Sequence, residues 1–234
     1  MNDRFANLIV GERISPRTGM LVGLISAGGL AFGTLEGWAL WETGLVTVLP
    51  WMPLFVGQLA WVYRRYQWLA LFYALVVTQS GHFVEHVSQM VQIHVLGLQG
   101  AAARGIFGSL DIEWVHFVWN TWVLIVVLVL LRRYGGNGWV RLSVLLTGWH
   151  ELEHVYILSV YLQTGISGTP GPLSSGGLIG GGLPVSRPDL HFLYNLVETV
   201  PLVLGFLYQL HVAEQPLVKT RRGTTWNLGR PAPG

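Results

Sequence analysis

The chain contains no cysteine, and only 11% of its 234 residues are charged. The absence of cysteine excludes disulfide bonds, iron–sulfur clusters and thiolate-ligated haem or zinc, so a bound metal would need imidazole and oxygen ligands. Soluble domains usually carry about 25% charged residues, whereas 51% of this chain is hydrophobic. The composition therefore predicts a protein embedded in a lipid bilayer. The formal net charge of +2 gives no reason to expect nucleic acid as a partner.

Long apolar runs support this prediction. A hydrocarbon layer of ~30 Å requires about 20 mostly apolar helical residues. Six stretches qualify as transmembrane helices, namely 20–42, 45–63, 67–97, 110–131, 138–164 and 189–212. Gly44 and Pro50 leave open whether the first two stretches are two full spans or one broken element. We expect an all-α integral membrane protein in which residues 1–234 form a single membrane domain.

The positive charges predict the orientation of this domain. Most Arg and Lys residues precede the first stretch, follow the second, separate the fourth from the fifth, or follow the sixth. By the positive-inside rule both termini are then cytoplasmic, and we expect the protein in the plasma membrane. Arg104 and Arg187 are exceptions on the outer side. The expected divisions are a cytoplasmic N-terminus (1–19), an N-terminal helix pair (20–64), a first repeat (67–131), a second repeat (138–212) and a cytoplasmic tail (213–234).

Two motifs recur in the same order. The pattern H-x-x-E-H occupies 82–86 and again 150–154, and H-F-x-aromatic-N occupies 116–120 and again 191–195. We interpret residues 78–131 (segment 1) and 147–207 (segment 2) as a tandem duplication. Both copies run in the same direction, so they form parallel repeats related by an axis along the membrane normal. Four helices from two copies predict a bundle in which the copies face each other.

The recurring motifs supply metal-ligating side chains. Residues three and four apart share one helix face, and the candidate ligands are His82, Glu85, His86, His116, His150, Glu153, His154 and His191. Ionisable groups inside a bilayer cost several kcal/mol each unless paired. A metal offsets that cost, and imidazole suits iron, copper and zinc. We predict two transition-metal ions in the outer half of the bilayer, or one ion shared on the axis between the copies, with iron or copper before zinc. The alternative is a hydrogen-bonded histidine network.

Five further polar residues lie near these candidates. Asn120 and Asn195 follow the second motif's histidines by one turn, where each can bond a ligand carboxylate or an imidazole N–H, or serve as interhelical amide contacts. Glu151 and Glu198 are candidate additional ligands or proton relays, although each lacks a counterpart in the other copy. Glu113 lies one turn before His116 and joins this set.

These features predict a membrane oxidoreductase with a dinuclear iron or copper site, acting on a hydrophobic substrate or a quinone. Glu85 and Glu153 would bridge or terminally bind the ions. A zinc-dependent lipid hydrolase with a glutamate base is the alternative enzyme. Metal transport or storage, and haem or chlorophyll binding, are the non-enzymatic alternatives. Any of these roles is compatible with a subunit of a larger membrane complex.

Overall fold

The computed structural model describes residues 15–214, and every named element in that range is helical. The elements are α2 (Pro16–Leu35), α3 (Leu40–Val48), η1 (Leu49–Trp51), α4 (Met52–Tyr66), α5 (Trp68–Met90), the π-helical η2 (Val91–Val95), η3 (Gly100–Ala102), α6 (Gly108–Tyr134), α7 (Gly138–Thr164) and α8 (Arg187–Glu214). The charges used for orientation at positions 4, 13, 219, 221 and 222, and most of the predicted tail, lie outside the described residues.

The N-terminal pair forms as two elements, but the predicted boundaries are wrong. The break falls after Leu35, where Gly37 adopts a φ of 68°, and not near Gly44, which lies inside α3. Glycine reaches this left-handed conformation at little cost, so it ends the helix. Pro50 lies in η1, the short 3-10 turn that joins α3 to α4, and the three elements form one continuous helical stretch, Leu40–Tyr66. Proline inside a helix removes one backbone hydrogen bond, which is consistent with the change of helix type at this point.

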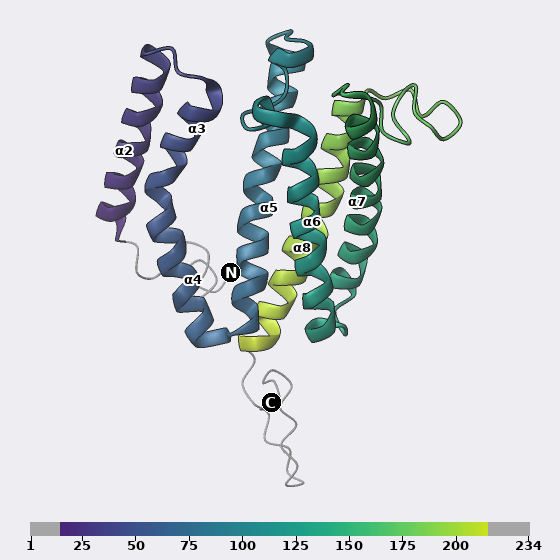
Figure 1. Ribbon diagram of the computed structural model, residues 1–234. Coiled ribbons are helices and arrows are strands. Elements are labelled where there is room, and N and C mark those ends of the chain that lie inside the picture. Colours follow the sequence, from purple (N-terminus) through teal and green to yellow (C-terminus); the bar gives the residue numbers. More distant parts are fainter. Residues whose placement is uncertain (1–14, 215–234) are drawn as a thin grey trace.

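Helices α5 to α8 form a bundle, and α2 to α4 stand beside it (Figure 1). Helix α5 packs along α8, α6 packs along α7, and α7 also contacts α8. Helices α5 and α7 run in one direction, while α6 and α8 return in the other (Figure 1). The first helix of each segment therefore packs against the second helix of the other segment, as well as against its own partner.

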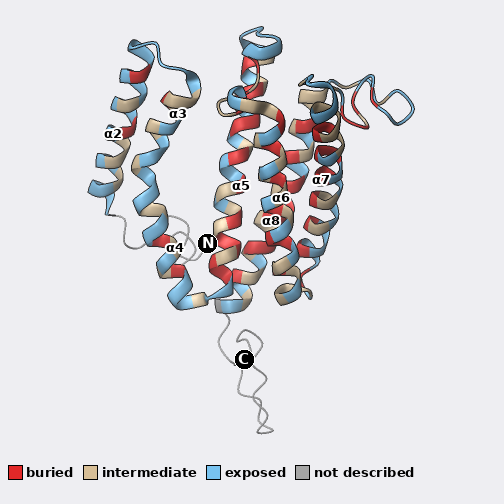
Figure 2. Ribbon diagram, viewed as in Figure 1, coloured by how far each residue is buried: buried red, intermediate tan, exposed pale blue. Residues whose placement is uncertain are grey.

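Four helical stretches are long and apolar enough to cross a membrane: Pro16–Leu35, Leu40–Tyr66, Gly108–Tyr134 and Arg187–Ala213. Helices α5 and α7 are similarly long but are not among them. Both carry an H-x-x-E-H motif, and these polar residues lower the average hydropathy. Their polar face is buried within the bundle (Figure 2). The chain thus has four candidate membrane-spanning helices, and the count of six stays a prediction.

The interior of the bundle changes character along its length. Near the start of α5 and the end of α8 it is a closed apolar core that includes Phe72, Leu75, Leu130, Leu202 and Leu210. Toward the other end, the buried side chains are mainly histidine, glutamate, glutamine and asparagine. A polar interior therefore occupies one half of the bundle, and a packed hydrocarbon core closes the other half.

Candidate metal centre

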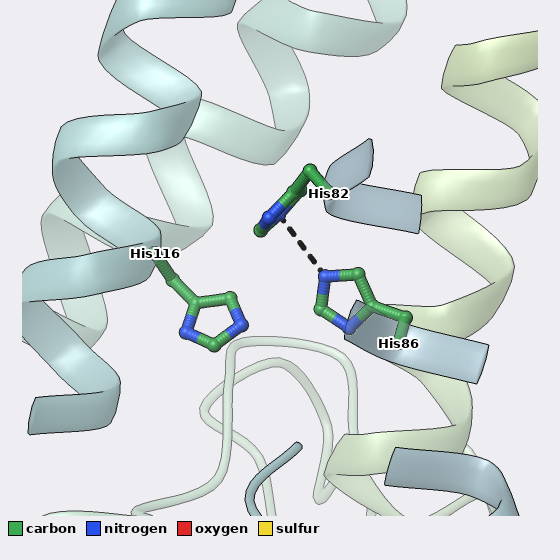
Figure 3. Close-up of side chains that lie close together, drawn as sticks. All are labelled: His82, His86 and His116. Atoms are coloured by element: carbon green, nitrogen blue, oxygen red, sulfur yellow. Dashed lines mark hydrogen bonds between the residues drawn. The ribbon is translucent and has the colours of Figure 1, made fainter. Parts of the chain in front are cut away.

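Histidines converge as two triads in the polar half of the bundle. The first (triad 1) contains His82 and His86 from α5 with His116 from α6, and these rings point toward one another (Figure 3). The second (triad 2) contains His150 and His154 from α7 with His191 from α8. Within each triad, one nitrogen of every ring lies within 4.8 Å of the others. As predicted, each segment supplies two histidines from its first helix and one from its second.

The nitrogen spacings suit a single small ion in each triad. In triad 1, His82 Nε2 lies 3.1 Å from His86 Nε2. In triad 2, His150 Nε2 lies 3.3 Å from His154 Nε2 and 3.1 Å from His191 Nδ1. An ion holding imidazoles at 2.0–2.1 Å in tetrahedral geometry separates their nitrogens by ~3.4 Å. These three nitrogen pairs are therefore close to the spacing that a metal requires, and the nitrogen of His116 lies within 4.8 Å of the other two of triad 1.

The two triads are parts of one cluster. The ring centroids of His86 and His191 are 4.7 Å apart, and those of His116 and His154 are 5.8 Å apart and nearly parallel. None of the six rings is more than 6% exposed. Two buried triads that could each hold a metal ion therefore lie side by side.

Two imidazole tautomers follow from hydrogen bonds on the far side of the rings. His116 Nδ1 donates to the carbonyl oxygen of Ile112 over 2.6 Å, which leaves its Nε2 lone pair for a metal. His150 Nδ1 lies 3.0 Å from Glu198 Oε2, and both side chains are 1% exposed. A carboxylate behind a ligating imidazole fixes the ring's tautomer and raises its basicity. Glu198, a predicted ligand or relay, thus lies behind a candidate ligand.

Glu85 and Glu153 lie outside the triads. Glu85 Oε1 accepts hydrogen bonds from the backbone amides of Phe107 (2.8 Å) and Gly108 (3.0 Å). The Oε2 atoms of Glu85 and of Glu153 are both buried without a hydrogen-bond partner among the described residues. Each carboxylate thus retains one oxygen that a metal or a proton can occupy, and the predicted ligand role of both glutamates stays a prediction.

A glycine of the following loop presses on each of these carboxylates. A Cβ atom at Gly105 would collide with the Glu85 carboxylate, and one at Gly171 would collide with that of Glu153. The two segments therefore share a feature that the motifs did not reveal, in which a loop glycine closes over the glutamate of H-x-x-E-H. The sequence indicates these contacts only in that both loops are rich in glycine.

Asn120 and Asn195 bond to backbone rather than to a ring nitrogen or a carboxylate. Their Nδ2 atoms donate to the carbonyls of His116 (2.9 Å) and His191 (3.0 Å), respectively. Asn195 Oδ1 also accepts from Gln79 Nε2 at 3.3 Å, and Gln79 Oε1 accepts from Trp119 Nε1 at 3.0 Å. This network forms a polar floor beneath the cluster. Gln79 was missed by sequence reasoning, although its place one turn before the first histidine was a usable signal.

Glu151 and Glu113 form their hydrogen bonds with groups other than the histidine rings. Glu151 accepts a 2.7 Å hydrogen bond from Thr121 Oγ1. Glu113 forms a two-pronged pair with Arg187 at 3.0 and 2.7 Å and also accepts from the amide of Gly168. Glu113 therefore connects α6 to α8 and to the loop between α7 and α8, and Glu151 connects α7 to α6. In this arrangement neither has an atom in hydrogen-bond contact with a histidine.

A pocket of about 430 Å³ leads to the cluster from the end of the bundle where α5 finishes and α6 and α8 begin. Its lining includes His116 and His191, which contribute one histidine from each triad. Arg104 and Arg187, the two exceptions to the charge asymmetry, also line it. The pocket thus connects the candidate centre with the exterior.

No protein-family model, curated protein or solved structure matches the chain.

Proposed function

We propose that this protein is an integral membrane oxidoreductase with a dinuclear metal centre, in which each ion is held by one histidine triad. The observation that carries the proposal is the adjacency of two buried triads, in each of which the ligand nitrogens lie within 4.8 Å of one another and at least one pair lies 3.1–3.3 Å apart. Within the triads, ring nitrogens of neighbouring imidazoles lie only 3.1–3.3 Å apart. An ion between these nitrogens would use their lone pairs directly.

The ligand set favours copper or iron among redox metals. Imidazole suits copper, iron, nickel and zinc, whereas a set of two histidines and one carboxylate is typical of non-haem iron. Triads made only of histidine favour copper, and entry of Glu85 and Glu153 into the ligand sets would favour iron. When bound, the ions supply the electron-transfer chemistry. The protein excludes water from them, and Glu198 orients His150.

The closed end of the bundle counts against transport. A permeation path would continue past the triads, yet Phe72, Leu75, Leu130 and Leu202 are buried and fill the interior there. The close packing of the six imidazole rings, with centroids of neighbouring rings 4.6–5.8 Å apart, also leaves no room between them for a macrocycle. These observations make transport and pigment binding weaker candidates than an enzymatic function.

Zinc-dependent hydrolysis of a lipid ester or amide is the second candidate. Catalytic zinc is often held by three protein ligands such as three histidines, and keeps a water in the fourth position. The unpartnered Oε2 of Glu85 or Glu153 is a suitable base for that water. The same geometry thus supports a redox-inert metal, and the identity of the ion separates the two functions.

The proposal includes the predicted topology. Six spans, a tandem duplication of segments 1 and 2, cytoplasmic termini and a plasma-membrane location would place the pocket on the outer side. A hydrophobic substrate or a quinone, and partner membrane subunits, are compatible with the exposed apolar surface of the helices. Substrate would then reach the triads from the outer leaflet.

Elemental analysis of the detergent-purified protein tests the proposal, combined with electron paramagnetic resonance of the same sample. Copper or iron in an amount that matches two triads supports the redox function. Zinc alone transfers support to the hydrolase. A protein purified without chelators that contains no transition metal would show that the histidine cluster is only a hydrogen-bonded network.

A further inference from the structure

The walls and the rim of the pocket differ in polarity. Ile93, Leu98, Ile112 and Pro188 provide apolar walls, and the buried rings of His116 and His191 also line the cavity. Gln99, Ser186 and the backbone of Gly100 lie exposed at the rim. Small-molecule sites are typically apolar cavities of about 300–1,000 Å³ with a few polar groups that fix orientation. This cavity, with its volume of about 430 Å³, fits that description.

The two arginines of the pocket differ in their charge balance. Arg187 is neutralised by its paired contacts with Glu113. Arg104 forms no salt bridge with any of residues 15–214, and its guanidinium makes a single hydrogen bond, to Ser167 Oγ at 3.1 Å. Most of its N–H donors therefore lack a protein acceptor in this part of the chain, although the side chain is half-buried. A partly desolvated guanidinium with free donors is a strong site for a carboxylate or another oxyanion.

We propose that the pocket binds a small molecule with an apolar body and one carboxylate or other oxyanion. Arg104 holds the anionic group near the rim, and the apolar body extends between the walls to the rings of His116 and His191. This inference rests on the proposed function, because it makes the bound molecule the substrate of the centre. It narrows the substrate class from any hydrophobic compound to a singly anionic amphiphile.

The pocket is lined by one histidine from each triad. His116 belongs to triad 1 and His191 to triad 2, and their ring centroids are 5.1 Å apart. A molecule in the pocket that contacts the rings of His116 and His191 therefore lies beside one ligand of each proposed ion. Arg104 directly precedes Gly105, the loop glycine that lies against the Glu85 carboxylate, so the proposed anchor of the anion and this contact belong to the same loop between α5 and α6.

A matched pair of probes tests the proposal. Calorimetric titrations of the full chain in zwitterionic nanodiscs would compare 4-phenylbutyrate with 4-phenylbutanol, using empty nanodiscs as the blank. The two probes share an apolar body and differ in the charged group. We expect the carboxylate to bind at least about tenfold more tightly, as expected for hydrogen bonds to a charged group. Equal affinity for the two probes would overturn the proposal without any use of a variant.

The Arg104→Gln variant locates the preference. It should abolish the discrimination between the probes, whereas Arg132→Gln, at the exposed far end of α6, should retain it. Retention of the full preference in Arg104→Gln would also overturn the proposal. Metal analysis of the same samples separates this inference from the proposed function. A metal-free protein that still prefers the carboxylate through Arg104 would refute the redox centre and leave the anion pocket standing.

Discussion

Segments 1 and 2 build the same triad but surround it differently. Each contributes two histidines four residues apart and a third from the next helix. The first histidine of each H-x-x-E-H motif packs against the aromatic ring of the second motif, His82 on Trp119 with centroids 5.0 Å apart and His150 on Tyr194 with centroids 5.4 Å apart. Behind His150 there is also the carboxylate of Glu198. The motif positions equivalent to Glu198 and Trp119 are Val123 and Tyr194. Two ions held in these triads would therefore experience different electrostatic environments.

The carboxylates of the two H-x-x-E-H motifs differ as well. Glu85 is anchored by the amides of Phe107 and Gly108, whereas Glu153 has no hydrogen bond to any of residues 15–214. Glu85 is fixed toward its loop, and Glu153 is the freer of the two. The geometry of the histidine triads is thus repeated in the two segments, while the surroundings of the triads differ.

Removing the ligands of one segment is the strongest test of this comparison. The double variant His82→Ala with His86→Ala should lose the ion of triad 1 and so about half of the metal. His150→Ala with His154→Ala should lose the other half. Plasma mass spectrometry of the purified variants measures both. His94→Ala is the control, because His94 is exposed and bonds Asp189 instead. Loss of all metal in either double variant would instead indicate one shared ion.

The contact that joins the two segments should give the next largest effect. Glu113→Gln leaves Arg187 without its partner, and breaking a buried pair in this way costs about 3–5 kcal/mol. Because Arg187 is 13% exposed, we expect about 3 kcal/mol at the low end of that range. Thermal unfolding in detergent measures the loss. The double variant with Arg187→Gln should recover part of it, and additive losses would contradict a direct interaction.

Much of the bundle was predictable from the sequence. The range 138–164 coincides with α7, and 67–97 differs little from Trp68–Val95, because charged or glycine-rich segments bound these helices clearly. The first pair was less predictable. Gly37, Gly44 and Pro50 can each break a helix when the local sequence is considered alone, and of these three residues only Gly37 adopts a left-handed conformation. Local composition does not say which glycine the fold uses for the turn.

The candidate site was predictable in its histidines and less so in its surroundings. Periodicity along one helix brings His82 next to His86, and the repetition of both motifs identified the third histidine of each triad. The sequence could not reveal three other contacts of the site. These are the hydrogen bonds from loop amides to Glu85, the contact of Gly171 with Glu153, and the pairing of Glu113 with Arg187. These contacts join residues 18–74 positions apart, and such long-range contacts depend on how the loops fold back over the bundle.

The loop glycines offer a graded test of the two carboxylates. Gly105→Ala should lower the free energy of unfolding by about 2–4 kcal/mol, because it combines overpacking against an anchored Glu85 with a left-handed backbone; Gly105 has a φ of 82°. Gly171→Ala should cost less, about 1–3 kcal/mol, because its φ is not left-handed and Glu153 is free to shift. Thermal unfolding measures both effects.

Two helical glycines control for the loss of glycine itself. A Cβ at Gly81 in α5, or at Gly148 in α7, would meet nothing within 4 Å. Alanine there should be neutral or slightly stabilising, since alanine favours helix by up to about 1 kcal/mol over glycine. Equal losses in Gly105→Ala and Gly171→Ala would remove the distinction drawn between an anchored and a free carboxylate.

The smallest expected effect tests the electrostatic difference between the triads. Glu198→Gln preserves shape but removes the charge behind His150, and loss of such a partner typically lowers metal affinity 10–100-fold. Only the metal affinity of triad 2 should fall, because the position equivalent to Glu198 in segment 1 is the apolar Val123. Titration with a competing chelator should therefore resolve one weakened and one unchanged ion. Glu151→Gln is the matched control, since that carboxylate bonds Thr121 rather than a ring. Equal weakening in both variants would mean that buried negative charge in general, and not the Glu198–His150 contact, sets the affinity of triad 2.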